Sequence, residues 1–143
     1  MITFTNTIRI NRPVADVYAY LSDLEHAPEW NWAIAKTTRT TPGRVAVGTR
    51  YRQTRTSPGP GTDTLEITAL DVNRHIAVRG TLAQLPARLA YDLHKVDGAT
   101  ELTNTVTLEP QGPLRLAAPV TGLGIKRGVA DNLDQLKKRL DRP

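Results

Sequence analysis

Cysteine is absent from this 143-residue sequence, and aromatic side chains are few. Without cysteine, the fold has no disulfide framework and the protein has no thiolate chemistry. No apolar run approaches the roughly 20 residues that a membrane-spanning helix needs. The first residues, MITFTNTIRI, lack both the charged region and the apolar region of a signal peptide. The sequence therefore predicts a cytoplasmic protein without stable membrane insertion.

The length and the charge of the chain narrow the class of protein. A chain of 143 residues predicts a single domain, residues 1–143, with one sizeable core. Nineteen basic residues against fourteen acidic ones give a net charge of +5. Because the arginines are scattered and not clustered, this charge does not indicate nucleic-acid binding. Their excess over lysine suggests a GC-rich bacterial genome.

The N-terminal third begins as a strand and continues as two short helices. In ITFTNTIRI, apolar and polar residues alternate, which is typical of a half-buried strand. Pro13 suits the first turn of a helix whose apolar residues follow at helical spacing up to Leu24. Asp23 ends that helix and is a candidate cap for a second one. Pro28 is expected in the first turn of the second helix, which would carry residues 29–32.

Six further strands are expected between residues 33 and 109. The segments are rich in Thr, Val and Leu, and they are AIAKTTRTT, VGTRYRQTRT, DTLEITALDV, HIAVRGTLA, ARLAYDLHKV and TELTNTVTLE. Turn signals separate them, at Pro42-Gly43, at residues 57–61, at Asn73, at Pro86 and at Asp97-Gly98. Spacings of about ten residues are typical of an antiparallel meander.

The last thirty residues predict a long helix over 114–141. Its apolar stripe comprises Ala118, Ile125, Val129, Leu133, Leu136 and Leu140, with Gly122 in register. Pro119, Gly122 and Gly124 predict a bend or a late start. The predicted order is one strand, two short helices, six strands and one helix, in one α+β domain.

This order of elements and several short sequence segments resemble the START-like, or helix-grip, superfamily. The matching segments are RPVADVYAYLSD at 12–23, APEW at 27–30, VGTRYRQTR at 47–55 and GIKRGVADNLDQLKKRL at 124–140. The resemblance covers nearly the whole chain and is strongest to the polyketide cyclase/dehydrase-like subgroup. It implies a seven-stranded antiparallel sheet curved around the C-terminal helix, with a cavity between them.

Strand alternation selects candidate residues for the wall of such a cavity. Polar residues on apolar faces are Asn6, Gln53, Arg55 and Asn104, and Tyr51 and Tyr91 add hydroxyl groups. Buried amides need hydrogen-bond partners, so these residues suit a partly hydrated cavity of roughly 300–1,000 Å³ that holds an amphipathic ligand. The alternatives are that these residues hydrogen-bond to one another in a packed core, or that they lie on an edge strand whose inner face is solvated.

Small apolar residues would leave room for a ligand in that cavity. They are Val47, Val78, Val106 and Val129. We predict that Tyr51, Gln53 and Tyr91 converge on one cavity, with Val129 contributed by the helix. The predicted ligand is a small hydrophobic molecule, and no cofactor or metal is expected.

The stretch EWNW, residues 29–32, holds both tryptophans of the chain. On a helix the two side chains lie about 200° apart and cannot share a face. We therefore expect Trp30 to pack the short helix against the core. Trp32 is expected to be more exposed and to line the mouth of the cavity, where it would cover an entering ligand.

Several other chemistries find no support in the sequence. The three histidines lack metal-ligand spacing, and the two serines lie in no nucleophile elbow. The stretch GLGIKRG lacks the spacing of a phosphate loop. RYRQTR, at 50–55, would divide its arginines between two faces of a strand, which disfavours nucleic-acid binding. By the same alternation, no carboxylate is expected on the inner face.

Two functions remain open at this stage. The first is binding of a lipid, a polyketide or an aromatic metabolite without chemistry. The second is that of a polyketide cyclase, aromatase or dehydratase, in which the cavity holds the chain in a reactive fold and a tyrosine or Arg55 polarises a carbonyl. The lack of an inward acid or histidine favours binding. The sequence leaves the oligomeric state open, a homodimer included.

Overall fold

The computed structural model describes residues 1–56, 60–82, 85–109 and 118–141. Its first elements are β1 (Ile2–Ile10), α1 (Val14–Ser22) and the short 3-10 helix η1 (Leu24–Glu29). Six strands follow, β2 (Ile34–Arg39), β3 (Arg50–Arg55), β4 (Gly61–Asp71), β5 (His75–Leu82), β6 (Leu85–Val96) and β7 (Ala99–Leu108). The last element is α2 (Ala118–Leu140). The predicted order of elements is confirmed.

All seven strands form one antiparallel sheet in the order β1-β7-β6-β5-β4-β3-β2. The chain thus meanders from β2 to β7, and β1 pairs with β7 along its whole length, from Ile2 opposite Leu108 to Ile10 opposite Thr100. The Asp97-Gly98 turn between β6 and β7 has positive φ at both residues, as a tight two-residue hairpin requires. A register shift between Ile67 and Ala69 interrupts β4, and such an irregularity bends a strand.

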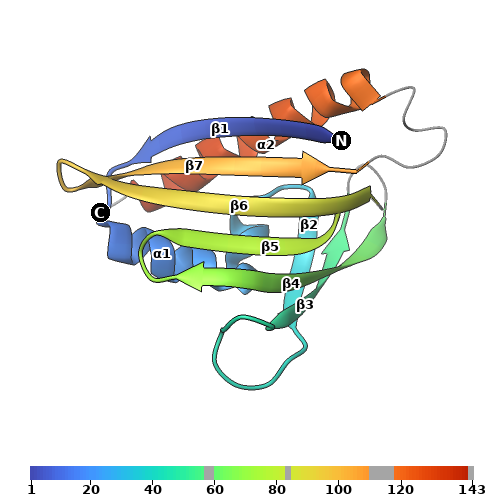
Figure 1. Cartoon of the computed structure of the whole chain (residues 1–143), viewed down its shortest axis with the longest axis horizontal. Helices are drawn as coiled ribbons and strands as arrows, with labels where there is room; N and C mark the ends of the chain where they lie inside the picture. The colour runs from blue at the N-terminus through green and yellow to red at the C-terminus, as the bar shows by residue number, and fades with distance from the viewer. Residues whose placement is uncertain (57–59, 83–84, 110–117, 142–143) are drawn as a thin grey trace.

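The three helices lie on one face of the sheet, and the core lies between the two layers. Figure 1 shows α2 passing behind β1 and β7, and α1 lying behind the middle strands. The main core cluster joins Val17 and Leu21 of α1 to inward residues of the sheet such as Ile67 and Leu102. On α2, Leu133, Leu136 and Leu140 are buried, while Ile125 and Val129 are partly buried against the core.

The stretch EWNW does not lie on a helix, which corrects the sequence-based expectation. The short helix η1 begins at Leu24 with Asp23 as its cap, and the Asp23 carboxylate accepts a hydrogen bond from the Glu25 amide. Pro28 lies inside η1, near its end and not in its first turn. Glu29 is therefore the last helical residue, and residues 30–33 form the turn that leads into β2.

Three other local predictions differ from the structure or lie outside it. Pro86 lies within β6, opposite Thr81, and not in a turn. Val47 precedes β3 and is 62% exposed, so it does not face the sheet's interior. The predicted helix start at Leu114 falls among residues 110–117, and the side chains of residues 118–124 lie outside the described part as well.

The burial of the α2 stripe predicts a large cost for a charge at its centre. Leu133 is 1% exposed, so Leu133→Asp should lower the free energy of unfolding by about 3 kcal/mol or more, since it leaves a buried carboxylate unpaired. Gln135→Asp adds the same charge at an exposed position of the same helix and should change stability by less than about 1 kcal/mol. Urea unfolding of both variants measures the difference. Equal midpoints would show that the stripe is not buried.

Candidate functional site

A cavity of about 90 Å³ lies between the concave face of the sheet, α2 and the η1 turn. This volume corresponds to roughly three water molecules in the liquid, at ~30 Å³ each. The expectation of roughly 300–1,000 Å³ is wrong for this conformation. The reason is that Leu24 and Trp30 of the η1 region and Val129 of α2 pack against the core and occupy the space.

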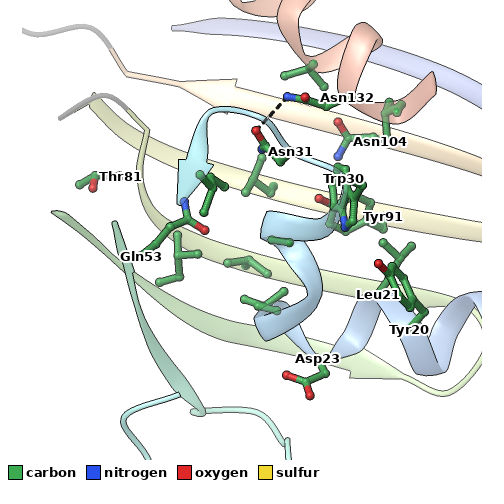
Figure 2. Close-up of a pocket in the computed structure, with 18 residues that line it drawn as sticks. Tyr20, Leu21, Asp23, Trp30, Asn31, Gln53, Thr81, Tyr91, Asn104 and Asn132 are labelled. Atoms are coloured by element: carbon green, nitrogen blue, oxygen red, sulfur yellow. Dashed lines mark hydrogen bonds between the residues drawn. The ribbon is translucent and has the colours of Figure 1, made fainter. Parts of the chain in front are cut away.

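The wall of the cavity is mixed in character (Figure 2). Its apolar residues come from the helices, the η1 region and the strands, and they are Leu21, Leu24, Ala27, Trp30, Ile34, Leu65, Val78, Leu89, Val129 and Leu133. Its polar residues are Tyr20, Asp23, Asn31, Gln53, Thr81, Tyr91, Asn104 and Asn132. An apolar wall with a few converging polar groups is the usual make-up of a small-molecule site.

Two of the four carboxamide side chains in the wall belong to the sheet and are almost completely buried. Gln53 of β3 is 5% exposed, and its Oε1 accepts a hydrogen bond from the Thr37 hydroxyl at 3.3 Å. Asn104 of β7 is 1% exposed, and its Nδ2 donates to the Ala90 carbonyl at 3.2 Å. Each amide thus has one end fixed by the protein, which holds the other end in place at the cavity wall.

The other two carboxamides connect the turn at residues 30–33, which we call the EWNW turn, to α2. Asn132 Nδ2 donates to Asn31 Oδ1 at 3.1 Å, and Asn132 Oδ1 accepts from the Trp32 amide at 3.4 Å. Asn31 Oδ1 also accepts from the Ala33 amide at 3.0 Å, which closes the turn on itself. We call the pair of Asn31 and Asn132 the amide clasp. It holds the turn, and with it Trp30, against the helix.

A second set of contacts holds the same region. The Tyr20 hydroxyl of α1 donates to the Glu29 carboxylate at 2.6 Å, and Glu29 forms an ion pair with Arg139 of α2 at 3.4 Å. The Tyr20 ring also stacks on His26, with ring centroids 4.4 Å apart. Burial of the hydroxyl and its hydrogen bond to Glu29 raise the pKa of Tyr20. All three helices therefore meet beside the cavity.

Tyr91 contributes a neutral hydroxyl group to the wall. It lies on β6 opposite Asn104 and is 8% exposed. Burial raises the pKa of Tyr91 to about 12, because the phenolate would lose its hydration inside the protein. At neutral pH the group is therefore a hydrogen-bond donor and acceptor and not a base.

A buried ion pair lies next to this site and corrects the sequence-based prediction that no carboxylate faces inward. Asp63 of β4 is 2% exposed, and Arg55 Nε donates to its Oδ2 at 3.0 Å. The Thr81 hydroxyl, which also lines the cavity, donates to Asp63 Oδ1. Asp63 is the first residue of the predicted segment DTLEITALDV, but β4 begins at Gly61, so Asp63 lies within the strand and shares the inward face of Leu65.

Four of the predicted ligand-binding residues line the cavity together. They are Gln53, Tyr91, Asn104 and Val129, and they come from β3, β6, β7 and α2. Their convergence follows from strand alternation, because residues two apart on a strand share a face and the curved sheet directs that face toward α2.

The other four predicted residues do not line the cavity. Tyr51 is fully buried in the core, Arg55 is engaged with Asp63, and Asn6 is half-buried on β1. Trp32 is 64% exposed and is not among the residues that line the cavity. Alternation identified the inward face for Tyr51, Arg55 and Asn6, but position along the strand and across the sheet decides which inward residues reach the cavity.

Two inward polar atoms have no hydrogen-bond partner within the described part of the chain, Tyr51 Oη and Asn6 Nδ2. Burial raises the pKa of Tyr51 to about 12, with the nearby Asp23 charge as a smaller cause. The Leu24 backbone lies close enough to lower that pKa slightly, but it makes no hydrogen bond of normal geometry with the hydroxyl. Neither Tyr51 nor Asn6 lines the cavity.

Sequence reasoning missed Asn31, Asn132 and Asp63. Asn132 had a detectable signal, because it lies three residues after Val129 and therefore on the inner side of α2. Asn31 had none, since the structure of a turn depends on what it packs against. Of the histidines on the strands, His94 is exposed, and half-buried His75 pairs with Asp92, with 2.7 Å between Nδ1 and Oδ1.

Comparison with known proteins agrees with this architecture. The family model described as "Polyketide cyclase / dehydrase and lipid transport" matches residues 1–141. No protein among those with curated descriptions matches the sequence significantly. The described residues contain no cluster of His, Asp or Glu suited to a metal ion, and no helix among them is both long and apolar enough to cross a membrane.

Several solved structures share the fold at low sequence identity. A START superfamily protein from Mycobacterium smegmatis superposes with a TM-score of 0.80 at 14% identity, over 99% of each chain. The Zhui aromatase/cyclase from Streptomyces gives a TM-score of 0.80 at 17% identity, over 98% of this chain and 93% of that one. A Thermus thermophilus protein gives 0.77 at 16% identity, over 96% of both chains.

These structural matches establish the fold, and the family match extends over nearly the whole chain. The seven-stranded sheet, the two short helices after β1 and the long C-terminal helix are those of the helix-grip architecture. The chain belongs to the polyketide cyclase/dehydrase and lipid transport family.

Proposed function

We propose that this protein binds a small hydrophobic or amphipathic molecule, such as a lipid, a polyketide or an aromatic metabolite, in the cavity between the sheet and α2. The observation that supports the proposal most strongly is the collection of carboxamide and hydroxyl groups on an otherwise apolar wall. In a core that only packs, such groups would be costly, because each buried polar atom without a partner destabilises the fold by about 1–3 kcal/mol.

The cavity must widen to accept such a molecule. Its present volume of about 90 Å³ is smaller than the roughly 150 Å³ that accommodates benzene in an apolar protein cavity. The part of the wall best suited to move is the EWNW turn. Its hydrogen bonds to α2 involve the Asn132 side chain, so they can break without disrupting the backbone hydrogen bonds of the sheet or of α2. Movement of Trp30, which lines the cavity, with this turn would widen it.

Within the widened cavity, the four converging residues have distinct roles. Val129 and the neighbouring apolar wall contact the apolar body of the ligand. Gln53, Tyr91 and Asn104 form hydrogen bonds to its polar groups. A large share of apolar contact with a few polar contacts that fix orientation is the usual division of roles in such sites.

The alternative function is that of a cyclase, aromatase or dehydratase acting on a bound polyketide-like chain. The Tyr91 hydroxyl supports it, since a buried donor with a pKa of about 12 can polarise a ligand carbonyl. Among the described residues of the wall, only Asp23, Tyr20 and Tyr91 can exchange a proton. Incubation with a linear poly-β-ketone thioester separates the two functions: aromatic product formed faster than without protein favours the enzyme, and binding without product favours the carrier.

Filling the cavity should abolish binding without unfolding the protein. Val129→Phe places a larger side chain in the wall, so we expect the affinity for the neutral dye phenylnaphthylamine to fall by at least about tenfold. Val47→Phe makes the same change at a residue that is 62% exposed and should bind the dye as the unmodified protein does. Fluorescence titration measures both affinities, and circular dichroism checks folding. Equal dye affinity in the two variants would place the dye elsewhere.

The two tryptophans should differ in their effects. Trp30 packs on the core and lines the cavity, so Trp30→Ala should lower the free energy of unfolding by about 2–4 kcal/mol and weaken dye binding. Trp32 is 64% exposed, so Trp32→Ala should leave both quantities nearly unchanged. Thermal unfolding and dye titration provide the measurements. Loss of dye binding in Trp32→Ala alone would restore Trp32 as a residue of the cavity mouth.

The burial of Tyr91 predicts a loss of stability at alkaline pH. Because its pKa is raised from 10.0 to about 12, its contribution is complete below pH 10 and is lost as the pH rises through the folded-state value. Tyr91→Phe should therefore lose less stability between pH 10 and pH 12 than the unmodified protein does. Urea unfolding at a series of pH values measures the slopes. Identical slopes would mean that the hydroxyl is hydrated in the folded state.

A further inference from the structure

The charge of the cavity wall separates it from sites that bind carboxylates. Among the described residues that line the cavity there is no lysine, arginine or histidine, and the one carboxylic acid is Asp23. Its carboxylate caps η1 through the Glu25 amide. An anionic ligand would therefore find a like charge in the wall and no cation. A buried charge without a partner is strongly unfavourable.

Two arginines whose partners contact or adjoin the cavity wall are engaged with carboxylates of the protein. Arg55 forms its buried ion pair with Asp63, and Asp63 in turn accepts a hydrogen bond from Thr81 of the cavity wall. Arg139 pairs with Glu29 on the outer side of the η1 turn. To serve a ligand carboxylate, Arg55 would have to leave Asp63 as an unpaired charge in the core. Such a loss is costly.

The open hydrogen-bonding positions of the wall are uncharged and of both kinds. Asn31 Nδ2 and Gln53 Nε2 are amide donors whose oxygens already accept hydrogen bonds, and neither nitrogen has a partner within the described structure. Asn104 is the reverse, because its nitrogen donates to Ala90 and its oxygen is open. The hydroxyl of Tyr91, opposite Asn104 in the sheet, can donate or accept.

We propose that the cavity selects uncharged molecules that carry both a carbonyl and a hydroxyl or amide group, and that it rejects carboxylates such as free fatty acids. The inference rests on the proposed binding function and names the chemical class of its ligand. Gln53 and Asn31 donate to the carbonyl oxygen of the ligand. Asn104 Oδ1 accepts from its hydroxyl or amide hydrogen and repels a carboxylate.

The test compares two ligands of nearly equal size and shape. Naphthalene carboxamide and naphthalene carboxylate, substituted at the same ring position, differ mainly in charge at neutral pH. Each is titrated against the protein with phenylnaphthylamine bound, and displacement of the dye is followed by fluorescence. We expect the amide to displace the dye at a concentration at least about tenfold lower than the carboxylate. Equal or better displacement by the carboxylate overturns the inference and leaves the binding function intact.

Variants assign the selectivity to the wall. Asn104→Leu removes the open acceptor and should reduce the preference for the amide over the carboxylate by at least about fivefold, while naphthalene itself binds as before. Asn6→Leu makes the same change at the residue opposite Asn104 on β1, which does not line the cavity, and should keep the preference. An unchanged preference in Asn104→Leu overturns the role of Asn104.

The dye itself separates failure of the inference from failure of the proposed function. Binding of the dye that is lost in Val129→Phe and kept in Val47→Phe shows that the cavity binds apolar molecules, whatever their charge. Absence of dye binding to the unmodified protein, together with no heat of binding for any of the naphthalene compounds by calorimetry, overturns the proposed function and the inference with it.

Discussion

The packing of α2 against the concave face of the sheet is the constraint on which the rest of the structure depends. Leu133 and Leu136 are almost completely buried among residues of α1 and of the strands. These contacts fix the distance between helix and sheet in the C-terminal half of α2. Toward the middle of the helix, Val129 is only partly buried. The cavity lies between this part of α2 and the sheet, and Val129, Asn132 and Leu133 line its wall.

Polar residues on the inner face of the sheet are stabilised in two different ways. Arg55 and Asp63 neutralise each other in a buried ion pair, and Thr81 supplies a further hydrogen bond to the carboxylate. Gln53 and Asn104 are neutral and are each bound to the protein at one end. Each of the two charged groups thus has an oppositely charged partner. Each of the two neutral amides keeps one hydrogen-bonding atom without a partner in the described structure. This difference is the basis of the proposal that the cavity binds an uncharged polar molecule.

The EWNW turn contributes both to the cavity wall, through Trp30 and Asn31, and to the protein surface, through Trp32. Trp30 supplies apolar wall, and Asn31 joins the turn to Asn132 of α2. Two attachments of this region to α2 are polar: the amide clasp, in which Asn132 is buried, and the Glu29–Arg139 pair, which is partly exposed. Such contacts contribute little net stability, since water replaces them when they break. The main cost of opening the turn would therefore be the loss of the Trp30 packing against the core.

The sequence by itself determined the order of the elements, the inward face of each strand and the apolar stripe of α2. These features follow from local periodicity, which strand and helix geometry impose on neighbouring residues. Only the tertiary structure decided which inward residues meet at the cavity. Tyr51 and Tyr91 both face inward, yet Tyr51 lies in the packed core and Tyr91 at the cavity wall. The length of β4, the end of η1 and the contacts of Asn31 also depended on long-range packing, because turn residues take their conformation from the elements against which they lie.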